Sequence, residues 1–176
     1  MSGIRLETDR LYLREMTQAD DPALCAILQD EEVMYADEGA FSDAEVQAWL
    51  DRQLARYGQY QHRYGLWAVV LKENDQMIGQ CGLTIQDWKD TQVLEIGYLF
   101  QKAWWHRGYA TEAAQACKAY AFDVLQADSV CSIIRDTNRA SQAVALRNGM
   151  TAGDTWTKHY RGVDMPHIRY EVKRHA

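Results

Sequence analysis

The stretch WWHRGYATEAAQACKAYAF, residues 104–122, decides the fold predicted for this chain. It follows the β-rich run QVLEIGYLF at 92–100 and continues, after one glycine at 108, as an alanine-rich segment with helical spacing. Side chains that are mostly small recur on one side of that segment and allow a helix to lie close on a sheet: Ala110, Ala113, Ala114, Cys117, Ala121 and Val124.

The start of this predicted helix has the character of an anion site. A helix N-terminus exposes backbone N–H groups without partners and carries a partial positive charge. Gly108 lets a ligand approach the backbone without a Cβ in the way, and Arg107 adds fixed charge. The pattern predicts a diphosphate cradle between the strand and the helix, and an ordinary strand–loop–helix connection is the alternative for this segment taken alone.

The rest of the chain predicts a mixed α/β sheet in one domain spanning residues 1–176. Ser42 and Glu45 form a capping box at the start of one helix, and Asn138 and Gly149 bracket another. The turn at 73–75 and the turn around Arg161-Gly162 each join two strands. The predicted strands cover 11–16, 66–72, 76–85, 92–100, 130–135, 151–158 and 167–173, and the predicted helices cover 20–30, 43–54, 109–124 and 139–146.

Composition excludes several function classes. The net charge of −6 argues against a nucleic-acid partner, which needs a basic surface. The N-terminus lacks an apolar signal core, and no stretch has the roughly 20 apolar residues of a membrane span. The four cysteines and five histidines show no metal-ligand spacing, so we expect no metal, reduced thiols and a cytoplasmic location. Sequence motifs of Rossmann, Walker and α/β-hydrolase sites are absent.

Three segments resemble the GNAT superfamily of N-acetyltransferases. LEIGYLFQKAWWHRGYATEA is similar to its acetyl-CoA motif, in the form W-G-K-G-Y-A-T-E-A of the RimJ/RimL-type branch. LETDRLYLR at 6–14 is similar to the opening strand of that branch, and TNRASQAVALRNGM at 137–150 resembles its N-x-x-S…K-x-G-F segment. The resemblance covers nearly the whole chain in order and implies a single-domain GNAT fold, with a mixed, mostly antiparallel sheet whose splayed central strands are flanked by helices.

The resemblance also implies acetyl-CoA as cosubstrate. The pantetheine arm is expected to add to the strand edge at 98–100, the diphosphate to bind backbone N–H groups at 107–111, and Asn138 and Arg147 to contact the pantetheine and the adenosine end. For the strand side chains core packing is the alternative, for Asn138 a simple helix cap, and for Arg147 an exposed arginine. The implied cofactor-binding residues are Tyr98, Leu99, Phe100, Trp105, His106, Arg107, Gly108, Tyr109, Ala110, Thr111, Asn138, Ser141 and Arg147.

The implied reaction needs a proton acceptor, because an alkyl amine with a pKa near 10.4 is mostly protonated at neutral pH. Glu95 is the candidate base, directly or through water, because it interrupts the apolar run Val93-Leu94-Glu95-Ile96; an outward-facing strand glutamate is the alternative. Backbone N–H groups at 97–99 are expected to stabilise the carbonyl oxygen. Many family members have a tyrosine acid where this chain has Ala145, so Ser141 is the candidate to stabilise the leaving sulfur.

The acceptor is predicted only as a primary amine, either a protein N-terminus or a small amine. Trp49, Trp67, Trp88 and Tyr35 lie in segments that could line its groove, although aromatic residues commonly belong to the core. The oligomeric state is left as a monomer or a homodimer. The competing functions are a non-catalytic acyl-CoA-binding or regulatory protein on the same fold and a partner-binding domain without a cosubstrate.

Overall fold

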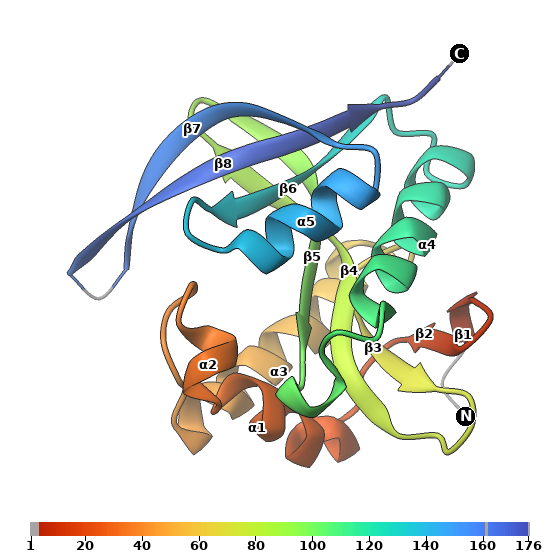
Figure 1. Ribbon diagram of the computed structural model, residues 1–176. Coiled ribbons are helices and arrows are strands. Elements are labelled where there is room, and N and C mark those ends of the chain that lie inside the picture. Colours follow the sequence, from red (N-terminus) through yellow and green to blue (C-terminus); the bar gives the residue numbers. More distant parts are fainter. Residues whose placement is uncertain (1–3, 161, 176) are drawn as a thin grey trace.

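The strands of this protein form one mixed eight-stranded sheet in the order β1-β2-β3-β4-β5-β6-β8-β7 (Figure 1). The computed structural model describes residues 4–160 and 162–175. Neighbouring strands are antiparallel except β5 and β6, which are parallel. The strands are β1 Ile4–Glu7, β2 Leu11–Arg14, β3 Leu66–Leu71, β4 Met77–Trp88, β5 Thr91–Phe100, β6 Ser129–Arg135, β7 Thr151–Tyr160 and β8 Val163–Lys173.

In the part of the chain that the structure describes, five α-helices and two short 3-10 helices surround the sheet. Figure 1 shows α1, α2 and α3 gathered at the end of the molecule opposite the long β7–β8 hairpin, with α5 in front of β5. The helices are α1 Asp21–Leu28, α2 Glu31–Met34, α3 Asp43–Gln59, α4 Tyr109–Asp123 and α5 Arg139–Arg147, and the 3-10 helices are η1 Gln18–Asp20 and η2 Lys102–Trp104. The predicted fold class, a mixed and mostly antiparallel sheet with helices on it, is confirmed.

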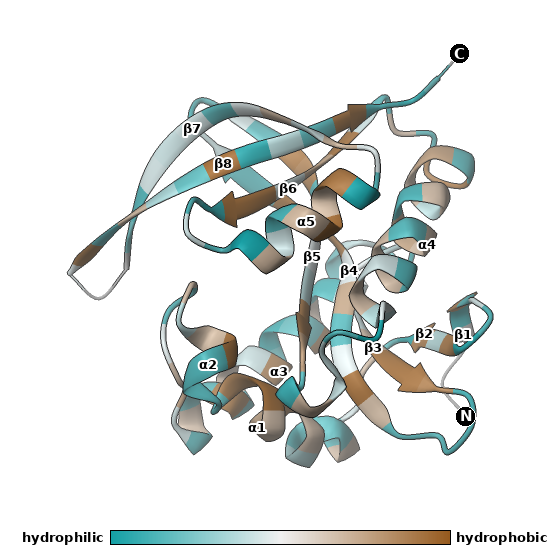
Figure 2. Ribbon diagram, in the orientation of Figure 1, coloured by the Kyte–Doolittle hydropathy of each residue, from teal (hydrophilic) through white to brown (hydrophobic). Residues whose placement is uncertain are grey.

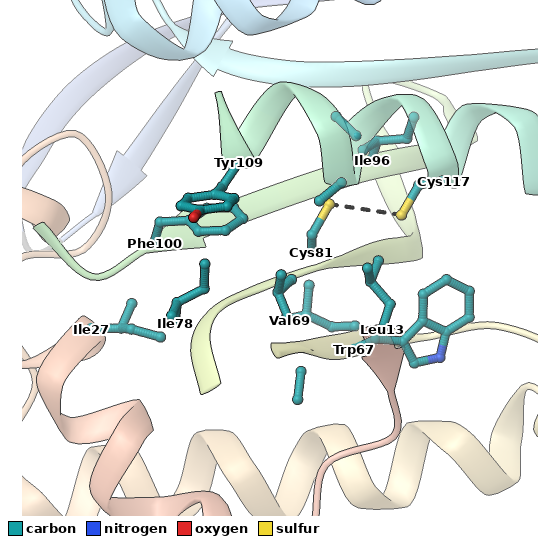
Figure 3. Packing of buried hydrophobic residues seen from close by; sticks show 14 of the residues in the cluster. Leu13, Ile27, Trp67, Val69, Ile78, Cys81, Ile96, Phe100, Tyr109 and Cys117 are labelled. Carbon is teal, nitrogen blue, oxygen red and sulfur yellow. Dashed lines mark hydrogen bonds between the residues drawn. The ribbon is translucent and has the colours of Figure 1, made fainter. Parts of the chain in front are cut away.

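The core is formed by strands β3 to β5 together with buried residues of α4, α1 and α3. Every residue of β3 is buried, so both faces of this strand are covered, and Figure 2 shows it as hydrophobic in contrast to β7. Ala113, Ala114 and Cys117 of α4 are fully buried, as expected for small residues that bring a helix close to a sheet. The thiols of Cys81 on β4 and Cys117 on α4 are both reduced and lie 3.7 Å apart. Figure 3 shows how they point toward each other.

Local signals predicted the starts of α3 and α5 and the end of α5, whereas α3 continues past the predicted end at Leu54 to Gln59. The Ser42 hydroxyl accepts a hydrogen bond from the Glu45 backbone N–H, and the Glu45 carboxylate accepts one from the Ser42 N–H. Asn138 caps α5 by accepting from the Ser141 N–H, and Gly149 ends that helix with a left-handed φ of 81°. These capping interactions confirm the predicted starts of α3 and α5.

Three predictions need correction, and part of a fourth lies outside the described residues. The opening segment 6–14 is not one strand, because a turn at Thr8 to Arg10 separates β1 from β2. The predicted strand at 76–85 continues to Trp88 as part of a long β4–β5 hairpin. Val124 does not pack on the sheet, because α4 has ended and its side chain is 53% exposed. Arg161, in the predicted β7–β8 turn, lies outside the described residues.

The four aromatic residues proposed for the acceptor groove lie in different environments, and three of them do not line a cavity. Trp67 is fully buried in the core and Trp88 is 1% exposed, so neither has a free face. Tyr35 is exposed but bonds the Thr137 carbonyl and does not line the groove. Only Trp49 of the four lines a cavity.

None of the helices in the described part of the chain has the length and apolar character of a membrane span.

Candidate active site

The central feature of the site is a gap between the parallel strands β5 and β6. Their register contains the single pair Glu95–Cys131, and the Ser132 hydroxyl then donates to the Ile96 carbonyl at 2.8 Å. Beyond Ile96, β5 continues to Phe100 paired with β4 alone. Backbone groups of alternate residues face the same edge of a strand, so those of Tyr98 face the gap while those of Gly97 and Leu99 face β4. Of the backbone N–H groups at 97–99 that were predicted to stabilise the carbonyl oxygen, only that of Tyr98 therefore faces the gap.

Helix α5 closes one side of this gap. The Tyr98 hydroxyl donates to the Ser141 carbonyl at 2.8 Å, and this bond ties β5 to the first turn of α5. Asn138 and Ser141 consequently lie beside Tyr98, and all three line one cavity. The side chain of Asn138 serves as the helix cap, so the alternative interpretation of this residue is correct for its Oδ1 atom.

Backbone conformation shapes the entry to α4. His106 and Gly108 both have left-handed φ values, 64° and 80°, and the residue before the helix start is Gly108 itself. An added Cβ at Gly108 would lie 3.4 Å from the Arg10 guanidinium. The left-handed φ therefore explains why glycine occupies position 108, because a Cβ there would meet only this one neighbouring side chain.

The first turn of α4 is fastened to the β1–β2 turn. The Glu112 carboxylate accepts from the Arg10 Nε at 2.7 Å and from the Arg10 backbone N–H at 3.0 Å, and it also accepts from the Thr8 hydroxyl. Burial raises the pKa of Glu112, but these hydrogen bonds outweigh it and hold the pKa below its usual value. The Arg10 guanidinium also stacks 4.2 Å from the centre of the Tyr109 ring. The loop at 105–108 is thus anchored on both sides.

Two cavities border these elements. The first, here called the helix-terminus cavity, has a volume of about 990 Å³ and is lined by His106, Gly108, Thr111, Arg147 and residues of the β1–β2 turn. The second, here called the strand-gap cavity, has a volume of about 300 Å³ and is lined by Glu95, Tyr98, Asn138, Ser141 and side chains of α3 and β8. The first cavity faces the predicted diphosphate cradle, and the second contains both candidate catalytic residues.

Glu95 points into the strand-gap cavity instead of outward to solvent. Its carboxylate accepts from the Ile133 backbone N–H at 2.7 Å, a bond possible because β6 has separated from β5. Burial raises the pKa of Glu95 to about 7, and the Ile133 hydrogen bond and the charge of Lys158 only partly oppose this effect. A carboxylate with this pKa can take up and release a proton near neutral pH.

Sequence analysis missed several polar residues of the same cavity. Asp37 follows α2, and burial raises its pKa to about 6, aided by Glu38 and opposed by Lys158 and Arg135. His167 of β8 is buried, its Nδ1 donates to the Met165 carbonyl at 2.7 Å, and burial lowers its pKa. Asp37 lies in a turn and His167 lies in a predicted strand, and neither position carries a sequence signal for this cavity. Their approach to Glu95 depends on how distant segments pack.

The remaining predicted residues support the site from within. The Trp105 indole N–H donates to the Phe100 carbonyl at 3.0 Å, and Tyr109 packs beside Phe100 in the core (Figure 3). The Arg107 guanidinium lies 5.0 Å from the centre of the Trp104 ring. Leu99 lines the strand-gap cavity, whereas the side chains of Phe100, Trp105, Arg107, Tyr109 and Ala110 line neither cavity. Within the described ranges, no three His, Cys, Asp or Glu side chains gather to hold a metal ion.

Comparison with known proteins establishes the family. The model of the acetyltransferase (GNAT) domain matches residues 10–151. YkkB of Bacillus subtilis (strain 168) is 34% identical over 173 residues, which cover 96% of this chain and 95% of YkkB. The chain therefore belongs to the GNAT acetyltransferase family, and the predicted enzyme class, an acyltransferase, is confirmed.

Solved structures share the fold along the whole chain. An acetyltransferase from Agrobacterium tumefaciens str. C58 has 27% identity and a TM-score of 0.79, covering 99% of this chain and 96% of its own. RimL, a ribosomal L7/L12 alpha-N-protein acetyltransferase solved with coenzyme A, has 16% identity and a TM-score of 0.78, covering 97% of this chain and 98% of its own.

Proposed function

We propose that this enzyme transfers the acetyl group of acetyl-CoA to a primary amine within the strand-gap cavity, with Glu95 as proton acceptor. The observation that carries the proposal is the position of Glu95: its carboxylate lies in a cavity at the open edge of β5, and its pKa is about 7. An alkyl amine becomes nucleophilic only after it loses a proton, so a group of this pKa is suited to the step.

The residues present fit acetyl-CoA, which supplies an activated acetyl thioester when bound. The open edge of β5 offers the Tyr98 backbone groups to an extended amide chain, as in strand addition. The helix-terminus cavity is lined by His106, Gly108, Thr111 and Arg147 beside the N-terminus of α4, and its volume suits a diphosphate and nucleoside. RimL, which shares this fold, has been solved with coenzyme A.

Each catalytic assignment follows from these positions. Glu95 accepts the amine proton, directly or through a water. The Tyr98 N–H, aimed into the gap, stabilises negative charge on the reacting oxygen. Ser141 lines the same cavity and offers a hydroxyl to the departing sulfur. Ala145 stands at the position where the family resemblance implies a tyrosine, and it is 1% exposed, so this chain provides no phenol at that position.

The absence of that phenol favours a second candidate, a non-catalytic acyl-CoA-binding protein on the same fold. We assign the chain to the RimJ/RimL-type branch and to the cytoplasm on the basis of its sequence motifs and its reduced cysteines. Within this branch the acceptor is either a small amine or a protein N-terminus.

An acceptor screen tests the proposal. Thiol release from acetyl-CoA is measured with a panel of small amines and peptides, in parallel with the Glu95→Gln variant. Amine-dependent release that is strongly reduced in Glu95→Gln supports the proposal. Binding of acetyl-CoA without release with any amine supports the non-catalytic candidate.

A further inference from the structure

Helix α3 presents a basic stripe to the strand-gap cavity. Trp49, Arg52 and Arg56 are spaced three and four residues apart, so they lie on one side of the helix, and all three line the cavity. The Arg52 guanidinium lies 5.6 Å from the centre of the Trp49 ring. We use "basic stripe" below for Arg52 and Arg56.

Two hydrogen bonds fix the position of this helix along the sheet. The Trp49 indole N–H donates to the Gln80 side chain at 3.2 Å, and the Tyr60 hydroxyl accepts from the Ile85 backbone N–H at 3.2 Å. Each helical residue advances about 1.5 Å and each strand residue about 3.4 Å, so the two contacts are roughly 16–17 Å apart along both elements. Helix α3 and strand β4 therefore run side by side in step.

This alignment places the basic stripe level with Glu95. Arg56 lies between the two contacts, about 10.5 Å along α3 from Trp49, and is therefore level with Leu83 of β4, next to Thr84. Thr84 pairs with Glu95 of β5, so the side chains of Thr84 and Glu95 are on the same face of the sheet. The cavity thus has two arginines on its α3 wall. Its other walls carry the carboxylates of Glu95, Asp37 and Glu38 together with the cations Arg135 and Lys158.

The basic stripe is not neutralised by the protein itself. Across residues 4–160 and 162–175, the arginines that form salt bridges are Arg5, Arg10, Arg14, Arg169 and Arg174, and neither Arg52 nor Arg56 is among them. Asp51, the neighbouring carboxylate on α3, accepts instead from the side chains of Gln18 and Gln47. Two arginines that face a cavity without an acidic partner are suited to bidentate binding of a carboxylate.

We propose that the acceptor is a small amine that also carries a carboxylate, an amino acid in the broad sense, bound with its amine toward Glu95 and its carboxylate on Arg52 and Arg56. This inference rests on the proposed function, because it specifies the acceptor of the same reaction. The cavity volume of about 300 Å³ suits a molecule of amino-acid size. Arg52 and Arg56 are then specificity-determining residues and take no part in proton transfer.

The test compares acceptors that differ only in charge. Initial rates of thiol release are measured for unbranched ω-amino carboxylic acids of increasing chain length, each matched with its primary carboxamide. The variants are Arg52→Gln/Arg56→Gln and, as a control of equal charge change, Arg63→Gln/Lys173→Gln, whose residues line neither cavity. The chain length with the highest rate reports the distance from the reacting amine to the basic stripe.

We expect wild type to favour at least one carboxylate over its carboxamide by about tenfold or more in kcat/KM, as for one charge-assisted hydrogen bond. In Arg52→Gln/Arg56→Gln the preference should fall to about threefold or less, through a higher KM for the carboxylates than for the carboxamides. The control variant should keep the wild-type preference. Transfer to carboxylates and carboxamides at equal rates would overturn the inference and leave the acetyltransferase function intact.

Two further outcomes are informative. Peptides that begin with glutamate could react better than peptides that begin with glutamine, while free amino acids do not react. This result would overturn the inference that the acceptor is a free amino acid. If no amine is acetylated, calorimetry with 5-aminopentanoate in the presence of coenzyme A tests whether the carboxylate site exists without catalysis. Binding that is lost in Arg52→Gln/Arg56→Gln supports the carboxylate site without catalysis, and absence of binding overturns the inference along with the proposed function.

Discussion

Replacing Glu95 by glutamine removes the proposed proton acceptor with little change in shape. The glutamine Oε1 can still accept from the Ile133 N–H that Glu95 now bonds at 2.7 Å, so the gap between β5 and β6 should persist. The pKa of Glu95 is about 7, and activity requires its ionised form. Roughly one tenth of the carboxyl is ionised one pH unit below the pKa and roughly nine tenths one unit above, so turnover should rise about tenfold across that interval in wild type.

The assay is the rate of thiol release at saturating acetyl-CoA and amine, measured between about pH 5.5 and 8.5. Glu95→Gln should lower the rate by about 10²–10⁴-fold, the usual contribution of a general base, and should remove the acidic limb near pH 7. Affinity for acetyl-CoA should remain close to wild type. A variant that retains both the rate and the limb would refute Glu95 as the proton acceptor.

Glu95→Gln, which should lower activity, should raise the stability of the fold above pH 7. Folding raises the pKa of Glu95 from 4.5 to about 7, so the native state holds this proton more tightly than the unfolded state. The contribution to stability is fully present below pH 4.5 and is lost as the pH rises through 7. Glu95→Gln should therefore be more stable than wild type above pH 7, by at most about 3 kcal/mol, and similar to it at low pH. Chemical denaturation at two pH values measures this difference, and an unchanged difference would show that burial of Glu95 is not costly.

Four other predictions concern the cosubstrate and the framework of the site. Acetyl-CoA at about 100 times its dissociation constant should stabilise the fold by roughly 2.7 kcal/mol, and a folded protein whose melting temperature does not respond would contradict the cosubstrate. Gly108→Val should weaken acetyl-CoA binding in calorimetry and cost about 1–2 kcal/mol of stability at the left-handed φ of 80°, whereas Gly108→Ala should show mainly the stability loss. Ser141→Ala should lower single-turnover thiol release by roughly 10- to 150-fold without changing the affinity for acetyl-CoA, and a rate within about twofold of wild type would show that the sulfur needs no protein donor. Glu112→Gln should lower the melting temperature at neutral pH, because the pKa of Glu112 is below its usual value when folded, and the difference from wild type should vanish as the pH falls below 4.5.

Local signals in the sequence were sufficient for most elements. The glycine before α4, the capping box of α3 and the Asn138 cap of α5 each act within a few residues, and the structure bears out all three element starts. The alternation and the turn at 73–75 likewise predicted the β3–β4 hairpin, although the end of β4 was misplaced. Such features depend on neighbouring residues alone, so one sequence contains them.

The features that were missed depend on contacts between distant segments. The break between β1 and β2 is held by Thr8 and Arg10 on Glu112, which lies about a hundred residues away in the chain. The wall of the strand-gap cavity formed by Arg52 and Arg56 needs α3 aligned with β4, and its helical spacing alone does not reveal a cavity. Glu95 was predicted as the candidate base because a carboxylate in an apolar strand is unusual. Its hydrogen bond to the Ile133 N–H could not be predicted, because it depends on the separation of the parallel strands β5 and β6.

The central claim is that this chain moves an acetyl group to an amine in the strand-gap cavity. The most direct test incubates the protein with acetyl-CoA and a reactive amine from the screen, and then quantifies free thiol and acetylated amine in the same sample by mass spectrometry. Equal amounts of the two products, formed by wild type and greatly reduced with Glu95→Gln, are the predicted result. Saturable binding of acetyl-CoA by the folded protein, with no acetylated amine formed from any member of the panel, would contradict it.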